Sequence, residues 1–245
     1  MFDTLFFFPL YNGLMALFDI APWLDAGVAV IIFTIIIKLI LFPLSKKAIT
    51  TQVRMKELEP EINKIKEQYK NDKQNQGLKT MELYRQKGVN PFSSFVQLLI
   101  QLPILYALYV VFVQSGLPEV NLLYLYSFIS APVINMHFLG LVDISKASIT
   151  LSVIAAITQY FQLHYSLASM KRPEASTNKS ATPSMPDFAY TMNKQMKYIF
   201  PVMIFFISYK ISAVIAVYWA VSNLFTLGQE LYVRNRLAKK GSVTA

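Results

Sequence analysis

Long apolar segments, separated by stretches that carry nearly all of the charge, constrain this chain more than any other feature of its sequence. Only 15% of its 245 residues are charged and 54% are hydrophobic, whereas a soluble domain carries about 25% charged residues. Apolar runs of about 20 residues have the length of a membrane-spanning helix. The chain is therefore predicted to be an all-α polytopic membrane protein.

The order of apolar and polar segments predicts five membrane-spanning helices. In chain order the prediction is an interfacial amphipathic segment at 1–25, span 1 at 26–44, a helical hairpin at 45–91, span 2 at 92–113, a loop at 114–146, span 3 at 147–167, a loop at 168–197, span 4 at 198–209, span 5 at 211–231 and a basic tail at 232–245. The fourth span would measure roughly 18 Å, against a hydrocarbon core of about 30 Å. Such a short span requires a locally thinned bilayer.

Lysine and arginine residues alternate in density from one predicted segment to the next. Of the 23 basic residues, eleven lie in 45–91, five in 168–197 and four in the tail, whereas 1–25 has none and 114–146 has only Lys146. Basic residues accumulate in the cytoplasmic loops of membrane proteins. The pattern therefore predicts an N-terminus outside the membrane and a C-terminus in the cytoplasm.

The first segment, 1–25, lacks the basic region of a cleaved signal peptide. Leu10, Leu14 and Leu17 recur at helical spacing, while Asn12 falls elsewhere on the helix. This pattern predicts a helix that lies in the membrane interface.

The segment 45–91 is predicted to be the largest cytoplasmic piece, a helical hairpin. A heptad-like seam on its first helix consists of Met55, Leu58, Ile62, Ile65 and Tyr69. Pro60 should kink this helix or begin a new one after Glu59. A polar turn, NDKQNQG, is followed by a second helix with apolar residues at Leu78, Met81 and Tyr84.

A single lysine, Lys38, interrupts the apolar run FTIIIKLILFP. Lys38 could extend along its helix to the inner headgroups. Alternatively, it faces a hydrated cavity inside the bundle, as charges within the membrane usually do. Thr34 lies one turn earlier on the same face as Lys38 and favours the second interpretation.

Polar residues form stripes on three other predicted spans. The stripes are Ser94, Gln97 and Gln101; Thr158, Gln159 and Gln162; and Trp219, Asn223, Thr226 and Glu230. Each stripe alone could simply hold helices together through hydrogen bonds. Together with Lys38, the stripes favour a shared hydrated groove that is open to the cytoplasm and closed outside.

The sequence lacks the residues that most enzymes and metal sites require. It has no cysteine and only two histidines, and it carries no HExxH, GxSxG or glycine-rich phosphate-binding motif. An enzyme is therefore not expected, and neither is a cofactor. A small-solute transporter or channel, which would need a pathway to both sides, and a pure scaffold remain as alternatives.

Five blocks of the sequence resemble the YidC insertases, a family that includes the mitochondrial Oxa and chloroplast Alb proteins. In order, the blocks are TIIIKLILFPLSKKA, MKELEPEINKIKEQYKNDKQ, LYRQKGVNPFSSFVQLLIQLPILYALY, MKYIFPVMIFF and VYWAVSNLFTLGQE. The resemblance implies a five-helix membrane core with a cytoplasmic hairpin and a groove open to the cytoplasm and to lipid. It also implies a bacterial inner-membrane protein that inserts membrane proteins, alone or with the Sec translocon, and helps them fold.

The resemblance further implies roles for particular residues. Lys38 matches the family's groove arginine with a substitution that keeps the charge but loses the planar fork of donors. Thr34 matches the threonine one turn earlier, and Tyr218 and Trp219 match an aromatic pair that contacts substrate. The full set of expected groove residues is Lys38, Thr34, Gln97, Gln101, Thr158, Gln159, Gln162, Tyr218, Trp219 and Asn223.

The partners that the resemblance implies are nascent membrane proteins, the ribosome, the Sec translocon, the signal recognition particle receptor and membrane lipids. The basic hairpin and tail could bind either the ribosome or anionic lipid. The large extracytoplasmic domain that precedes this core in many Gram-negative members is not expected in this protein. The tail after Leu231 has only fourteen residues, which argues against strong tethering to the ribosome by the tail.

Overall fold

A computed structural model of the chain describes residues 7–70, 72–90, 101–102, 104–114, 118–167 and 185–241. Its elements are α1 (Phe8–Ile20), α2 (Ala26–Ile40), α3 (Phe42–Glu57), α4 (Glu59–Gln68), α5 (Lys73–Gln86), the π-helix η2 (Val110–Gln114), the 3-10 helix η3 (Leu122–Tyr124), β1 (His137–Phe138), β2 (Val142–Asp143), α7 (Ile149–Leu167), α8 (Met185–Ile211) and α9 (Ala213–Gly241). Residues 104–109 are also helical and lead into η2. The predominance of helices confirms the predicted all-α class.

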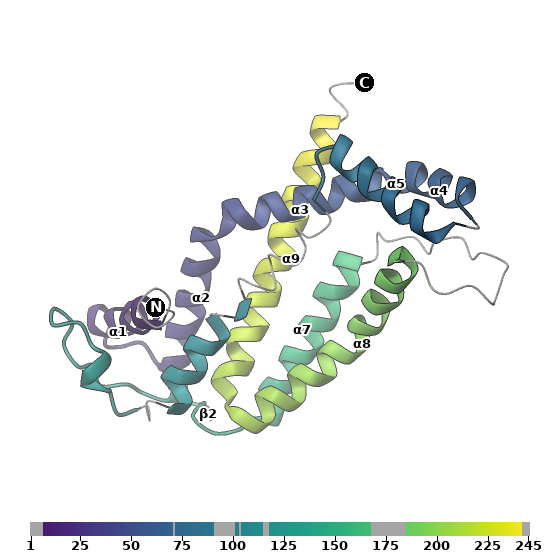
Figure 1. The fold of residues 1–245 in the computed structure, drawn as a ribbon. Helices are drawn as coiled ribbons and strands as arrows, with labels where there is room; N and C mark the ends of the chain where they lie inside the picture. The colour runs from purple at the N-terminus through teal and green to yellow at the C-terminus, as the bar shows by residue number, and fades with distance from the viewer. Residues whose placement is uncertain are drawn as a thin grey trace.

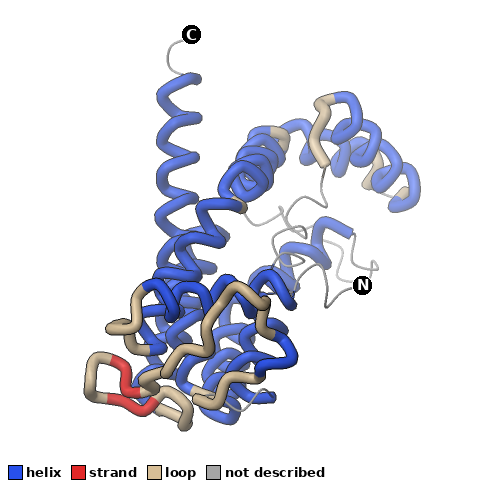
Figure 2. Tube along the Cα trace, turned by 90° about the vertical axis from the view of Figure 1, so that its left-hand side faces the viewer, coloured by secondary structure: helices blue, strands red, loops and turns tan. Residues whose placement is uncertain are grey.

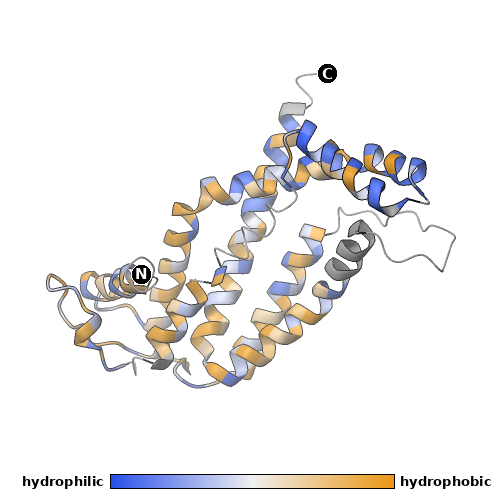
Figure 3. Cartoon of the chain, viewed as in Figure 1, coloured by the Kyte–Doolittle hydropathy of each residue, from blue (hydrophilic) through white to orange (hydrophobic). Residues whose placement is uncertain are grey.

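Helix α9 is the centre of the fold. It packs against α2 and α3 on one side and against α7 and α8 on the other (Figure 1). The polar colouring in Figure 3 gathers on α4, α5 and the C-terminal part of α9, whereas α2, α7 and α8 are largely apolar. The charged part of the molecule therefore lies at one end of an apolar helical bundle.

Two long helices differ from the predicted segments. Helix α8 has 27 residues and includes Pro201 in its interior, so the apolar segment 198–209 is the second half of a longer helix. Helix α9 has 29 residues and continues well into the predicted basic tail. Apolar content locates the part of a helix that avoids water, but polar residues with good helix propensity extend the helix beyond it.

A sharp bend separates α2 from α3. The two helices meet at 64°, and Pro43 occupies the first turn of α3, where its missing N–H removes no helical hydrogen bond. Among the described helices, none alone has both the length and the apolar composition of a membrane span, whereas α2 and α3 together meet both criteria.

Helices α4 and α5 pack against each other and form a small apolar core of their own. The buried residues of this core are Leu58, Ile62, Leu83 and Val89, with Met55, Ile65 and Tyr84 partly buried around them. The seam predicted for the first helix is therefore confirmed. Helix α4 begins at Glu59, with Pro60 in its first turn, as predicted.

The predicted apolar face of the second helix is wrong at Leu78 and Met81, whereas Tyr84 packs against the small core. The side chain of Asp72 caps α5 by accepting from the N–H of Asn75 at 3.0 Å, so the helix begins within the predicted turn. Its inner face is then formed by Gln76, Thr80 and Leu83. Leu78 and Met81 are 61% and 49% exposed.

Helix α1 packs on the segment that contains η3 through a buried asparagine. The side-chain amide of Asn12 donates to the carbonyl of Tyr124 at 2.8 Å, and its oxygen accepts from the N–H of Tyr126 at 2.7 Å. Sequence spacing placed Asn12 off the packing face of α1, and that placement is wrong. The amide can be buried because backbone groups far along the chain satisfy it.

Asp25 joins the start of α2 to the segment around the two short strands. One oxygen of its carboxylate caps α2 by accepting from the N–H of Val28 at 2.9 Å, and the other accepts from the N–H of Leu139 at 3.1 Å. The backbone carbonyl of Asn135 accepts from the N–H of Ala26, the first residue of α2, at 2.8 Å. The helix start and the strand pair are thereby held together.

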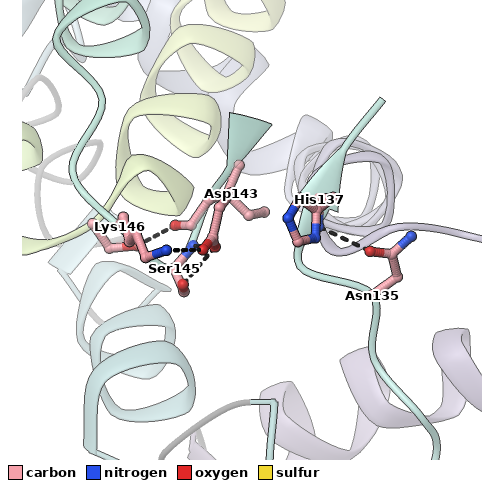
Figure 4. A network of polar contacts seen from close by, with 7 residues as sticks. Asn135, His137, Asp143, Ser145 and Lys146 are labelled. Carbon is pink, nitrogen blue, oxygen red and sulfur yellow. Dashed lines mark hydrogen bonds and ion pairs between the residues drawn. The ribbon is translucent and has the colours of Figure 1, made fainter. Parts of the chain in front are cut away.

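Strands β1 and β2 form an antiparallel pair with His137 opposite Asp143. Figure 4 shows the polar contacts at its base, where Asp143 accepts from Ser145 and pairs with Lys146 at 2.9 Å. The hydroxyl of Ser145 and the ammonium of Lys146 lower the pKa of Asp143 to about 2. The aspartate therefore stays ionised at any physiological pH.

We predict that Gly27→Ala destabilises the protein. A Cβ atom on Gly27 would overlap three ring atoms of Phe138, so the strand pair would have to move away from α2. Overpacking of this kind costs about 1–3 kcal/mol, which a lower unfolding temperature in detergent micelles would report. The matched control is Gly77→Ala in α5, where no atom lies within 4 Å of the new methyl group. An unchanged unfolding temperature for Gly27→Ala would contradict the described packing.

Candidate functional site

One face of α9 carries a column of buried polar side chains. Its members are Ser222, Asn223, Thr226, Gln229 and Glu230. They follow one another at helical spacing over nine positions, from which eight steps give about 12 Å of helix. Because α9 lies between α2 and α7, this column can bond to polar groups on both neighbours.

Lys38 meets this column from α2. Its side chain is 9% exposed, and its ammonium group donates to the hydroxyl of Thr226 at 3.1 Å. Thr226 in turn donates to the carbonyl of Ser222 at 2.7 Å, so its oxygen is correctly oriented to accept from the lysine. The side chain of Lys38 thus points into the bundle and not along α2 toward the headgroups.

The ammonium group of Lys38 has a neutral acceptor in place of a counter-ion. Among the residues that the structure describes, no carboxylate lies within ion-pair distance of Lys38. Gln229 contacts only its backbone, donating to the carbonyl of Lys38 at 3.4 Å. A buried cation without an anionic partner strongly favours any acidic group or water that reaches it.

Thr34 lies beside Lys38 but bonds within its own helix. Its hydroxyl is 3% exposed and donates to the carbonyl of Val30 at 2.6 Å. Such back-bonding satisfies a hydroxyl without a cross-helix partner. The remaining acceptor capacity of the oxygen faces the same side of α2 as Lys38.

The polar stripe on α7 contacts the column on α9. Asn223 donates to the hydroxyl oxygen of Thr158 at 3.3 Å. Gln159 is 5% exposed and donates to the side-chain oxygen of Gln162 at 3.1 Å. The structure therefore connects polar groups of α2, α9 and α7 in one layer of the bundle.

The aromatic pair on α9 has two different environments. Tyr218 is 1% exposed, and its hydroxyl accepts from the amide of Gln101 at 2.6 Å. Trp219 packs in an apolar cluster with Ala155, Ile204, Ile215 and Ala216. The assignment of Trp219 to a polar stripe is therefore wrong, because its face of α9 is covered by apolar parts of α7 and α8. Gln97 and Ser94 lie outside the described residues.

An ion pair at the end of the column was missed in the sequence. Arg234 bonds to the carboxylate of Glu230, which is buried, and also donates to the carbonyl of Ser166 near the end of α7 at 3.2 Å. The guanidinium also lies over the ring of Tyr165, 5.4 Å from its centroid. The spacing of Glu230 and Arg234, four residues apart on a helix, was the available signal.

The site offers the ammonium group of Lys38, the ion pair of Glu230 with Arg234 and several neutral hydrogen-bonding groups. The described residues contain no group of three or more His, Asp or Glu side chains that could hold a metal ion. A separate small cavity lies between α1, α2 and residues 104–111 and is lined by apolar side chains. The groups that the polar layer presents can bind polar or acidic segments through hydrogen bonds and charge.

The fold and this layer define a helical membrane protein with polar groups inside its bundle. The chain belongs to the family described as 60Kd inner membrane protein, which it matches over residues 18–240. It is 35% identical over 222 residues to the membrane protein insertase YidC of Clostridium tetani, which covers 90% of this chain and 86% of that protein.

Two further relatives show similar coverage. The chain is 32% identical over 210 residues to the membrane protein insertase YidC of Fusobacterium nucleatum, covering 86% of each protein. It is 31% identical over 230 residues to the YidC of Clostridium perfringens, covering 92% of this chain and 86% of that protein. The predicted resemblance to the YidC insertases is confirmed.

We predict that Glu230→Leu lowers the unfolding temperature strongly. Removing one partner of a buried ion pair leaves an uncompensated charge, at about 3–5 kcal/mol. The double variant Glu230→Leu/Arg234→Met replaces both charges by apolar side chains and should recover much of this loss. Thermal unfolding of both variants in the same detergent provides the comparison, and equal unfolding temperatures would contradict the coupling between Glu230 and Arg234.

Proposed function

We propose that this protein is a membrane protein insertase and chaperone that acts without chemical catalysis. The names of its relatives support this role. The observation that carries it is the orientation of Lys38, whose ammonium group lies among the helices and contacts Thr226. A substrate's polar segment would enter the layer formed by α2, α7 and α9 through a hydrated groove open to the cytoplasm.

The groove reduces the free energy of moving polar groups across the membrane. An unpaired polar group in hydrocarbon costs several kcal/mol. Within the groove, water and the amides and hydroxyls of the polar layer would bond to the substrate instead. The apolar segment of the substrate then partitions into lipid, and this transfer drives the step.

The bond between Lys38 and Thr226 is weak enough to be exchanged. Hydrogen bonds between helices in membranes contribute about 0.6 kcal/mol on average. A bond from an ammonium to a carboxylate joins two opposite charges, and in a medium of low dielectric constant it gains a Coulomb attraction that a hydroxyl acceptor does not provide. An acidic group on the substrate would therefore displace the hydroxyl, whereas Arg234 already has Glu230 as its partner.

The proposed orientation places the N-terminus outside and the C-terminus in the cytoplasm of a bacterial inner membrane. The gathering of polar residues on α4, α5 and the end of α9 supports it (Figure 3), because basic segments remain cytoplasmic. In this orientation the α4–α5 hairpin is positioned to meet a nascent chain or the ribosome. The Sec translocon and the signal recognition particle receptor are proposed as further partners.

The short apolar part of helix α8 would cause the bilayer around it to become thinner. Its apolar part, residues 198–209, measures roughly 18 Å along the helix axis. Lys197 lies over the rings of Tyr160 and Tyr198, 5.5 and 5.4 Å from their centroids, a combination typical of the membrane interface. A thinner bilayer would shorten the path that remains between the groove and the outside.

We predict that Lys38→Ala reduces the insertion of substrates with acidic translocated segments by about tenfold, equivalent to about 1.4 kcal/mol. Substrates with neutral translocated segments should be much less affected, because they form no ion pair with the ammonium group. Insertion into proteoliposomes, followed by protease protection of the translocated segment, measures both.

Lys38→Arg, which keeps the charge, and Lys210→Ala on the exposed side of α8 are the matched controls and should retain insertion. A photocrosslinker at position 38 should also label a stalled nascent chain. Full insertion of acidic substrates by Lys38→Ala would refute the role of the charge. Ion or solute flux through vesicles that hold the purified protein would instead favour a channel.

A further inference from the structure

The turn between β1 and β2 has an unusual sequence for its backbone conformation. Leu139 has φ of +52° and Gly140 has φ of +70°. Positive φ suits glycine and asparagine and is rare for a branched apolar side chain. Leu139 and Leu141 are nevertheless 63% and 83% exposed, so the structure places two leucines where water would favour polar residues.

Two more apolar side chains belong to the same part of the molecule. Trp23 is 80% exposed and Val133 is 93% exposed. Trp23 lies two residues before Asp25, whose carboxylate accepts from the N–H of Leu139. Val133 lies two residues before Asn135, which pairs with Asp25. The contacts of Asp25 therefore hold all three short segments beside one another.

This assembly is fixed to the helix ends on the side of the bundle away from α4 and α5. The assembly contacts the start of α2 and also the start of α9. At the start of α9 the N–H groups of Ala213 and Val214 donate to the carbonyls of Lys146 and Ile144, at 2.9 and 3.2 Å. Figure 1 shows β2 below the bundle, opposite α4 and α5, and Figure 2 shows both strands projecting past the helices. The leucines therefore lie where helices of a membrane protein leave the bilayer.

The chemistry of the assembly suits the boundary between lipid headgroups and acyl chains. The charged residues Asp143 and Lys146 pair with each other at the base of the strands, away from the tip (Figure 4). The tip itself carries leucines, and tryptophan is enriched at membrane interfaces. Exposed apolar side chains beside a helix end are stabilised when they leave water and enter the adjacent leaflet.

We propose that Trp23, Val133, Leu139 and Leu141, the outer anchor, insert into the phospholipid leaflet next to the start of α2. Only the assignment to the outer leaflet rests on the proposed orientation. Asp25 caps the helix that carries Lys38, and Lys38 lies thirteen positions further along, a rise of about 20 Å. The outer anchor would therefore fix the depth of Lys38 in the membrane.

The experiment uses the two tryptophans of the chain. Trp219→Phe leaves Trp23 as the only tryptophan in the full-length protein, and excitation at the red edge of the absorption band avoids the tyrosines. The variant is reconstituted in phosphatidylcholine–phosphatidylglycerol vesicles with or without brominated acyl chains. Bromine near the headgroups should quench Trp23 by about twofold or more, as expected for an interfacial residue, and iodide in the buffer should quench it little. Quenching by iodide without quenching by brominated lipid would overturn the proposal.

A second reporter examines the turn itself. Leu141→Trp in a Trp23→Phe/Trp219→Phe background should respond to brominated lipid, whereas Gln86→Trp in the same background, on the exposed side of α5, should respond to iodide. If the tryptophans at positions 141 and 86 responded alike to brominated lipid and alike to iodide, the proposal would be overturned. None of these readouts depends on insertion, so the outer anchor and the insertase function can fail independently.

A paired substitution separates the anchor from the fold. Leu139→Asn/Leu141→Asn should keep the unfolding temperature, because asparagine accepts positive φ, yet reduce quenching of Trp23 by headgroup-level bromine by about half or more. Leu78→Asn/Met81→Asn, at exposed apolar positions of α5, should leave that quenching unchanged. Unchanged quenching in the turn variant, or an equal loss in the control, would contradict the outer anchor.

Discussion

Polar groups inside a helical membrane bundle need partners from neighbouring helices, because lipid offers none. In this protein α9 supplies them. Its buried face bonds to Lys38 on α2 through Thr226 and to Thr158 on α7 through Asn223. The rest of the helical arrangement follows from this, since α2 and α7 must both lie against the same helix.

The two cations in this layer have opposite roles because their partners differ. Arg234 is paired with a buried carboxylate and bonded to the end of α7, so it holds two helices in place. Lys38 contacts a hydroxyl, and the free energy of that contact is small compared with the desolvation of an ammonium group. The arginine therefore stabilises the helix packing, whereas in the proposed mechanism the lysine binds another molecule.

The sequence predicted features that depend on spacing within one helix. The faces of Lys38 and Thr158, the seam from Met55 to Ile65 and the helix start near Pro60 all follow from helical periodicity. Prediction from the sequence failed where a partner far along the chain determines whether a side chain is buried. Asn12 is an example, because the backbone near Tyr124 satisfies its hydrogen bonds. Trp219 was misjudged for the same reason, because periodicity gives a face of a helix but not what covers it.

The contacts of Asp25 lie at the start of α2, and those of Lys38 lie near its end. In the proposed mechanism the contacts of Asp25 set the depth in the membrane at which Lys38 acts. In the proposed mechanism, the charge of Lys38 acts only at a depth that a substrate's polar segment can reach, and this depth is set where the helix is held at the membrane surface. Asp25 fixes the start of α2 to the strand pair through Leu139 and Asn135, while the 64° bend before α3 ends the helix just beyond Lys38. The short length of α2 between these two points therefore determines where the lysine acts.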